Sequence, residues 1–142
     1  KDTVLIEVNI DGKDEDKMES YLGESKALIV HSSTNPKHGK KAITHYSVIK
    51  KNEFYTMLEA WQETERKHQA RVHFQSIGHP IVGDERYGDE NINKTLKSRG
   101  FKRLFLHAEQ LQFEHPVTHE MMHFKAPLPN ELETLLSQQK IK

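Results

Sequence analysis

Apolar residues recur along this chain with two periods, one typical of strands and one typical of a helix. Residues 4–10 are rich in β-branched side chains and precede Asp11-Gly12, which predicts a strand followed by a turn. Residues 42–49 and 54–61 predict two more strands, joined as a hairpin about residues 50–53. In the second of these strands apolar groups fall on both alternating faces, so we expect it to be central in a covered sheet.

Residues 66–77 carry the helical period instead. The apolar positions recur at spacings of three and four, which predicts one buried stripe. They are Ala70, His73, Phe74 and Ile77. Arg71 then lies on a different face of the helix. Gly78 suits the left-handed conformation that ends a helix, and Pro80 prevents the helix from continuing.

The other segments are less regular in pattern. Residues 13–26 and 32–41 are polar and predict irregular structure around a short strand at residues 27–30, and residues 83–100 predict a long polar connection. Three short strands are predicted near the C-terminus, at residues 104–108, 111–113 and 121–124. Asn130 is the expected cap of a final helix. The pattern as a whole predicts an α+β fold, with a mainly antiparallel mixed sheet and a few flanking helices.

The composition is typical of one globular domain. Lys+Arg and Asp+Glu both number 21 in 142 residues, so the net charge is zero, which argues against a strongly basic nucleic-acid module. The stretches 37–41 and 94–103 are locally basic and are either an RNA-binding face or solvated loops. No run of 18 apolar residues predicts a membrane span. The absence of cysteine excludes disulfides and thiolate metal sites, and it mildly favours a cytosolic origin.

Arg71 is the strongest candidate for a functional side chain. On a helix anchored by Ala70 and Phe74, its guanidinium would be held in one place, where it could grip a carboxylate through two hydrogen bonds and keep it ionised. The alternative is a solvated surface arginine paired with a nearby glutamate. The pattern alone leaves both interpretations open.

Ten histidines raise the hypothesis of a zinc protein, which elemental analysis would test. His119 and His123 are four residues apart, but the segment between them has the pattern of a strand, and no third ligand has convincing spacing. There is no glycine-rich phosphate loop and no dinucleotide fingerprint. We therefore expect neither a metal nor a cofactor.

Several segments, taken together, resemble the large-subunit-type RNA pseudouridine synthases, the RluA family. The family has a Gly-Arg-x-His-Gln-x-Arg-Val-His segment, and residues 65–73 read Glu-Arg-Lys-His-Gln-Ala-Arg-Val-His. It also has an Ile-Gly-His-Pro-x-x-Gly-Asp-x-x-Tyr-Gly segment, which is similar to residues 77–88. Further matches follow the family's order, at residues 42–46, 103–108, 111–120 and 126–129.

The resemblance implies cofactor-free isomerisation of a uridine in RNA to pseudouridine. A uridine is flipped out of the RNA, an aspartate attacks it, the glycosidic bond breaks, and the base turns and is rejoined through carbon. In this family the arginine at the position of Arg71 pairs with that aspartate. The expected partner is structured rRNA or tRNA, contacted by Arg66, Lys67, His68 and Gln69. DNA and membrane partners are not expected, and the expected location is cytoplasmic.

The sequence departs from the family pattern at its chemical centre. The family's nucleophile lies in a His-Arg-Leu-Asp-x-x-Thr-Ser-Gly segment that does not occur in residues 1–142. Glu65 and His119 stand where the family has glycine, and a family tyrosine is missing near Ile6. We interpret residues 1–142 as the C-terminal part of a synthase catalytic domain whose upstream half supplies the aspartate, so that this chain alone is inactive. The alternative is a non-catalytic RNA-binding relative that has lost its aspartate.

Overall fold

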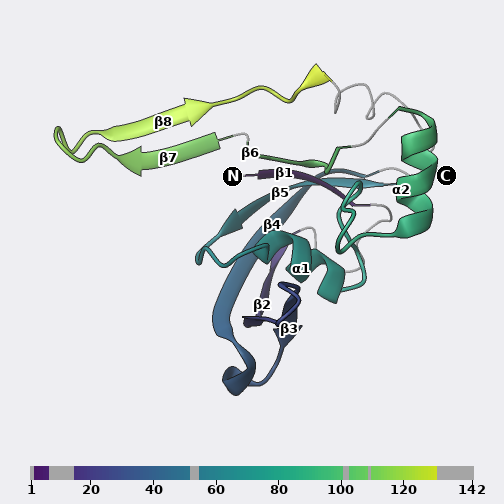
Figure 1. Cartoon of the computed structure of the whole chain (residues 1–142). Coiled ribbons are helices and arrows are strands. Elements are labelled where there is room, and N and C mark those ends of the chain that lie inside the picture. The colour runs from purple at the N-terminus through teal and green to yellow at the C-terminus, as the bar shows by residue number, and fades with distance from the viewer. Residues whose placement is uncertain (1, 7–14, 52–54, 101–102, 109, 131–142) are drawn as a thin grey trace.

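The computed structural model describes residues 2–6, 15–51, 55–100, 103–108 and 110–130. Six strands in this part of the chain form one sheet (Figure 1). They are β1 (Asp2–Ile6), β2 (Glu15–Glu24), β3 (Val30–Ser33), β4 (Lys40–Lys51), β5 (Thr56–Gln62) and β6 (Leu106–Ala108). Their spatial order is β3-β2-β4-β5-β1-β6, and every neighbouring pair is antiparallel. The predicted α+β class with a mainly antiparallel sheet is confirmed.

Strand β2 corrects the prediction of irregular structure for residues 13–26. It pairs with β4 from Glu15 opposite Ser47 to Leu22 opposite Lys40. Met18 and Leu22 are buried on one face, while the acidic residues that hid the pattern lie on exposed positions. The next strand is also displaced: a strand was predicted at residues 27–30, but β3 begins only at Val30. The loop predicted for residues 32–41 is reduced to a 3-10 turn, η1 (Pro36–His38), and its flanks.

Strands β4 and β5 confirm the predicted hairpin, and residues 52–54 between them lie outside the described residues. Strand β5 is central, with β4 on one side and β1 on the other. Leu58 and Ala60 are fully buried on one face. The opposite face is covered less completely than expected, because Trp61 on that face is 37% exposed. Strand β1 ends at Ile6, and the predicted turn at residues 11–12 is outside the described residues.

Helix α1 (Gln69–Ser76) lies against one face of the sheet (Figure 1). Ala70 and Phe74 are buried as predicted, and they pack in a cluster with Tyr46, Leu58 and Ile81. The helix is shorter than the predicted range 66–77, because His68 takes the left-handed conformation with φ 55° and the helix begins after it. The stripe also ends earlier than predicted, since Ile77 is 40% exposed. Gly78 has φ 82°, which confirms its predicted role in ending the helix.

His73 joins α1 to the sheet through polar contacts inside the core. Its side chain is fully buried, with Nε2 2.9 Å from Ser20 Oγ on β2 and Nδ1 2.7 Å from Thr44 Oγ1 on β4. Ser32 Oγ on β3 donates to Ser20 Oγ at 2.7 Å, which extends the chain of hydrogen bonds. Burial lowers the pKa of His73 to about 4, so the ring is neutral at physiological pH.

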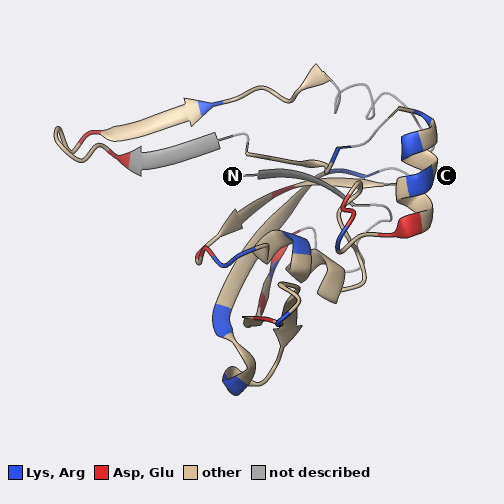
Figure 2. Ribbon diagram, in the orientation of Figure 1, with Lys and Arg blue, Asp and Glu red and all other residues tan. Residues whose placement is uncertain are grey.

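Helix α2 (Glu90–Ser98) corrects the prediction of a long polar connection at residues 83–100. Asp89 caps it, since its Oδ1 accepts from the backbone N–H groups of Asn91 and Ile92. Ile92 and Leu96, one turn apart, are buried against Tyr55, Val82 and Phe105. Figure 2 shows the acidic start of the helix in red and its basic residues in blue, which is the favourable orientation in the helix dipole.

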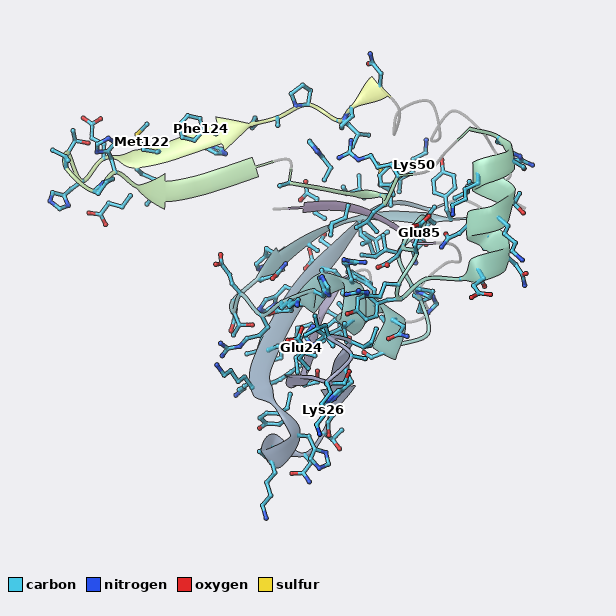
Figure 3. The ribbon with its side chains drawn as sticks, in the orientation of Figure 1. Glu24, Lys26, Lys50, Glu85, Met122 and Phe124 are labelled. Atoms are coloured by element: carbon cyan, nitrogen blue, oxygen red, sulfur yellow. The ribbon has the colours of Figure 1, made fainter. Side chains whose placement is uncertain are left out.

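The C-terminal strands agree with the prediction. Strands β7 (Gln110–Glu114) and β8 (Met121–Lys125) form a separate two-stranded hairpin that extends away from the sheet (Figure 1). Figure 3 shows Met122 and Phe124 on β8. The helix predicted after Asn130 falls on residues 131–142, outside the described residues. No helix among the described residues is long and apolar enough to cross a membrane.

Candidate functional site

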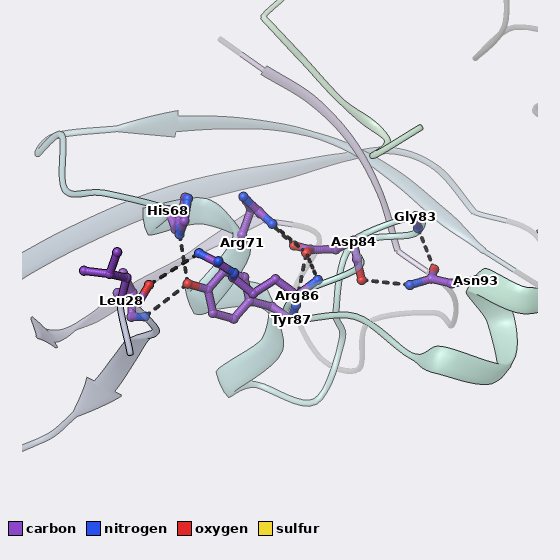
Figure 4. Close-up of polar contacts among 9 residues, drawn as sticks. Leu28, His68, Arg71, Gly83, Asp84, Arg86, Tyr87 and Asn93 are labelled. Atoms are coloured by element: carbon purple, nitrogen blue, oxygen red, sulfur yellow. Dashed lines mark hydrogen bonds and ion pairs between the residues drawn. The ribbon is translucent and has the colours of Figure 1, made fainter. Parts of the chain in front are cut away.

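Arg71 projects from α1 and forms a two-pronged ion pair with Asp84 (Figure 4). Its Nε donates to Asp84 Oδ2 at 2.9 Å, and its Nη2 donates to Asp84 Oδ1 at 2.8 Å. The Asp84 side chain is 0% exposed and the Arg71 side chain 21%, so the pair lies at the edge of the protein interior. The predicted fixed guanidinium is therefore present, and its partner within this chain is an aspartate rather than a surface glutamate.

Asp84 is held in place from several sides. Its Oδ1 also accepts from the backbone N–H groups of Arg86 and Tyr87, both at 3.0 Å. Asn93 of α2 donates from Nδ2 to the Asp84 carbonyl at 2.8 Å, and its Oδ1 accepts from Gly83 N (Figure 4). Burial alone would raise the pKa of Asp84, but the hydrogen bonds from Arg71 and the two N–H groups outweigh it and lower the pKa. Asp84 is therefore a charged, fixed anchor.

The ring of Tyr87 lies against the Arg71 guanidinium. The carbon at the centre of the Arg71 guanidinium lies 5.1 Å from the centre of the Tyr87 ring, within the range of a cation–π contact. The Tyr87 hydroxyl accepts from Val30 N at 3.1 Å and lies 2.8 Å from His68 Nδ1. Two sides of Arg71 are thus fixed, one by the Asp84 carboxylate and one by the Tyr87 ring.

His68 lies beside this pair and contacts Tyr87, with its Nδ1 2.8 Å from the Tyr87 hydroxyl oxygen. Burial lowers the pKa of His68, and the positive charge of Arg71 lowers it further. His68 also has the left-handed backbone conformation, which is uncommon for a residue with a side chain and concentrates at functional sites.

One edge of Arg71 remains available for a ligand. Asp84 uses Nε and one N–H of Nη2, which leaves both N–H groups of Nη1 and the second one of Nη2. Within the described parts of the chain, no other acceptor contacts the guanidinium. A second carboxylate could therefore bind end-on while Asp84 and Tyr87 hold the group still. Such a site would keep that carboxylate ionised.

The residues predicted to contact RNA divide into two kinds. Arg66, Lys67 and His68 lie on the surface loop that leads into α1. Gln69 is 2% exposed, and its amide is saturated inside the fold. Its Oε1 accepts from Thr64 Oγ1 and Arg66 N, and its Nε2 donates to Ile43 O and to Thr44 Oγ1. The side chain of Gln69 therefore links the loop to β4 instead of facing a ligand.

Sequence reasoning did not find Asp84 as the partner of Arg71. The available signal was local, since an aspartate followed two and three residues later by free backbone N–H groups is typical of a turn that the side chain closes. Asn93 carried no signal of its own. Among the described residues, no group of three histidine, aspartate or glutamate side chains is arranged to hold a metal ion.

Comparisons with known proteins show the family to which the chain belongs. The family model described as RNA pseudouridylate synthase matches residues 3–76, more than half of the chain. Ribosomal large subunit pseudouridine synthase C of Haemophilus ducreyi is 46% identical over 99 residues, which cover 70% of this chain and 31% of that protein. Ribosomal large subunit pseudouridine synthase D of Haemophilus influenzae is 43% identical over 108 residues, which cover 70% of this chain and 33% of that protein.

Solved structures show the same fold. Human RNA pseudouridylate synthase domain containing 1 superposes with a TM-score of 0.74 at 23% identity, over 90% of this chain and 54% of that one. Human RNA pseudouridylate synthase domain containing 4 gives a TM-score of 0.71 at 22% identity, over 95% of this chain and 61% of that one. The chain belongs to the RNA pseudouridylate synthase family, which confirms the resemblance seen in the sequence. It spans about a third of the length of the curated relatives it matches.

Proposed function

We propose that this chain is the arginine-bearing part of an enzyme that isomerises uridine in RNA to pseudouridine. The aspartate nucleophile comes from polypeptide outside residues 1–142, and Arg71 holds it by the edge that Asp84 leaves open. The substrate is structured rRNA or tRNA, approached by Arg66, Lys67 and His68. On this account residues 1–142 are the C-terminal part of the catalytic domain and form no pseudouridine alone.

The free edge of Arg71 is the observation that carries this proposal. A catalytic aspartate must stay ionised and aimed at the flipped uridine, and a guanidinium immobilised by Asp84 and Tyr87 can do both. Its preorganisation means that the charge interaction needs little rearrangement when the aspartate arrives. The relatives, about three times as long as the matched region, have ample chain in which such an aspartate could lie.

The residues of this chain bind and orient in the proposed reaction, and they undergo no covalent change. The aspartate attacks the flipped uridine, and the bond from the ribose to the base nitrogen breaks. The base turns, a bond from the ribose to a base carbon forms, and the bond to the aspartate breaks. The base carbon loses one proton and the base nitrogen gains one, so the product is an isomer of the substrate. Arg71 balances the negative charge of the aspartate before it attacks and after it is released.

The test begins with the residues encoded upstream of Lys1. A His-Arg-Leu-Asp-like segment there supports the proposal, whereas a start codon at this point favours an RNA-binding relative without catalysis. Residues 1–142, and the same chain extended by its encoded upstream residues, are then incubated with rRNA and with tRNA. Pseudouridine is quantified by mass spectrometry of the digested RNA.

The expected result is conversion by the extended protein and none by residues 1–142. Arg71→Met in the extended protein should lower the rate constant of conversion on the order of 10²-fold or more, because a preorganised charge interaction is lost. Lys125→Gln, at an exposed position on β8, is the control and should leave conversion unchanged. Conversion by residues 1–142 alone would overturn the assignment of the nucleophile, and unchanged conversion by Arg71→Met would overturn the role of Arg71.

A further inference from the structure

A cavity of about 440 Å³ opens beside the Arg71 site, within the size range of pockets that bind small ligands. It lies between the end of β2, the start of β3, the start of β4 and the loop that enters α1. Leu22 and Val30 form an apolar wall, and Lys40, Arg66 and Glu65 contribute charged groups. Such a mixture of apolar wall, cations and carboxylates matches a ligand that has a flat ring, an anion and hydrogen-bond donors.

The cations at and near this cavity differ in whether a carboxylate neutralises them. Lys67 is neutralised by Glu24, with Nζ 2.6 Å from Oε2. No carboxylate pairs with the ammonium of Lys37 or Lys40 among the described residues. Among the same described residues, the guanidinium of Arg66 donates only to the carbonyl of Lys41, at 3.1 Å. Two cations of the lining, Lys40 and Arg66, therefore have charge available for an anion, and so has Lys37 on the adjoining turn η1.

The segment that carries Val30, Gly39 and Lys40 of the lining has no acidic side chain. Residues 25–44 contain four lysines and neither aspartate nor glutamate. Figure 2 shows blue segments at the start of β4 and in the turn before it, and Figure 3 shows Glu24 and Lys26 near the β2–β3 end of the molecule. The cavity lining has three cations, Lys40, Arg66 and Lys67, against the two carboxylates of Glu24 and Glu65, so its net charge is positive and attracts a polyanion.

The floor of the cavity is built to be rigid. A Cβ added to Gly23 would lie 2.2 Å from the carbonyl oxygen of His38, and one added to Gly39 would lie 2.3 Å from the carbonyl of Leu22. The turn η1 and the end of β2 therefore pack backbone against backbone, and any side chain at either glycine would force them apart. The position of Lys40, which follows Gly39 directly, is fixed by this contact.

The cavity and the Arg71 site share a wall. Val30 lines the cavity, and its N–H donates to the hydroxyl of Tyr87, whose ring supports Arg71. Lys67 lines the cavity as well, and His68 beside it contacts the same hydroxyl. A nucleotide in the cavity would therefore be a near neighbour of the uridine that an aspartate held by Arg71 attacks.

We propose that this cavity binds one nucleotide of the RNA substrate next to the target uridine. Its phosphate lies on Lys40 and Arg66, its base lies against Leu22 and Val30, and Lys37 contacts the next phosphate along the strand. The inference rests on the proposed function and adds to it a defined surface for RNA. Single-stranded RNA fits this description because its unstacked bases can enter pockets while its phosphates remain exposed.

The experiment measures binding of a short fluorescein-labelled single-stranded RNA to residues 1–142 by fluorescence anisotropy, between about 50 and 200 mM salt. The test variant is Lys37→Gln with Lys40→Gln. The control variant is Lys50→Gln with Lys125→Gln, which removes the same charge from exposed positions on β4 and β8. Circular dichroism verifies that both variants stay folded.

The test variant should bind roughly tenfold more weakly, and its slope of log affinity against log salt should fall by about 1.4, because each of two phosphates that no longer meets a cation contributes about 0.7. The control variant should bind like the wild type. Equal weakening by both variants, or no weakening by the test variant, would overturn the assigned surface. Absence of RNA binding by the wild type would overturn it too.

The same variants separate this inference from the proposed function. In the extended protein, Lys37→Gln with Lys40→Gln should raise the KM for RNA and leave kcat nearly unchanged. Conversion with an unchanged KM would overturn the cavity assignment alone. No conversion by the unaltered extended protein would overturn the proposed function itself.

Discussion

Replacing Asp84 by asparagine tests the ion pair on which the candidate site is built. Asparagine retains Oδ1, which accepts from the N–H groups of Arg86 and Tyr87, but it places an amino group where Oδ2 accepts from Arg71 Nε at 2.9 Å. The substitution therefore removes the negative charge and turns one acceptor into a donor that faces another donor. Arg71 is left with an uncompensated charge.

The expected loss is about 2–3 kcal/mol of unfolding free energy. Breaking a buried pair by removing one partner costs about 3–5 kcal/mol, and the 21% exposure of the Arg71 side chain lets water recover part of it. Arg71→Met should cost about 3–5 kcal/mol, because the carboxylate it strands is 0% exposed. The double variant should lose less than the sum of the two single losses, with a coupling energy of about 2 kcal/mol.

Urea unfolding followed by fluorescence measures these values, and the single tryptophan of the chain, Trp61, is the probe. The pH dependence gives a second check. The lowered pKa of Asp84 stabilises the fold at neutral pH, and this contribution is lost as the pH falls below the ordinary value of 3.8. In Arg71→Met the pKa of Asp84 should rise, so acidification should relieve part of the loss. Single losses below about 0.5 kcal/mol, or additive losses in the double variant, would refute the reasoning.

Three further predictions concern groups that hold the site in place. The stability advantage of the wild type over His73→Gln should shrink by about 3 kcal/mol as the pH falls from 6.5 to 4, because His73 binds a proton in the unfolded chain and stays largely unprotonated in the folded one. An advantage that is constant with pH in urea unfolding would contradict this. Tyr87→Phe should cost about 1–3 kcal/mol by leaving the buried N–H of Val30 without an acceptor, and the His68 ring signals should shift in the NMR spectrum; unchanged signals would refute the contact. Asp89→Ala should cost about 1 kcal/mol through loss of the α2 cap, measured by thermal unfolding with Asn91→Ala as the control, and equal losses in both variants would argue against the cap.

Local periodicity was enough to predict α1 and the position of Arg71 on it. Ala70 and Phe74 are four residues apart and bury one face, and Gly78 ends the helix within two residues of its last turn. The same local signals predicted the β4–β5 hairpin. The start of α1 was not predictable in this way, because it depends on the left-handed conformation of His68. That residue also contacts Tyr87, which is distant in the sequence.

Strand β2 and helix α2 were missed for a shared reason. Each has only two buried apolar side chains, Met18 and Leu22 in the strand and Ile92 and Leu96 in the helix, so pattern alone could not distinguish them from loops. Pairing with β4 stabilises the first, and the Asp89 cap and packing against Phe105 stabilise the second. The stability of both elements therefore comes from tertiary contacts and a cap, which the spacing of apolar residues along the sequence does not reveal.

The partner of Arg71 lay beyond sequence reasoning because the two residues are 13 positions apart and on different elements. Periodicity describes one element at a time and gives no distance between a helix and a following loop. The family resemblance identified Arg71 as a carboxylate-binding residue, and the structure adds Asp84 as the group that orients it. The predicted pairing of Arg71 with an aspartate outside residues 1–142 stays a prediction.

The most direct test of that prediction is a crystal structure of the chain extended by its encoded upstream residues. The account predicts an aspartate carboxylate within hydrogen-bonding distance of Arg71 Nη1, with Nε and Nη2 still on Asp84. An upstream aspartate paired with another cation, or an Arg71 Nη1 that faces only solvent in the extended protein, would contradict it.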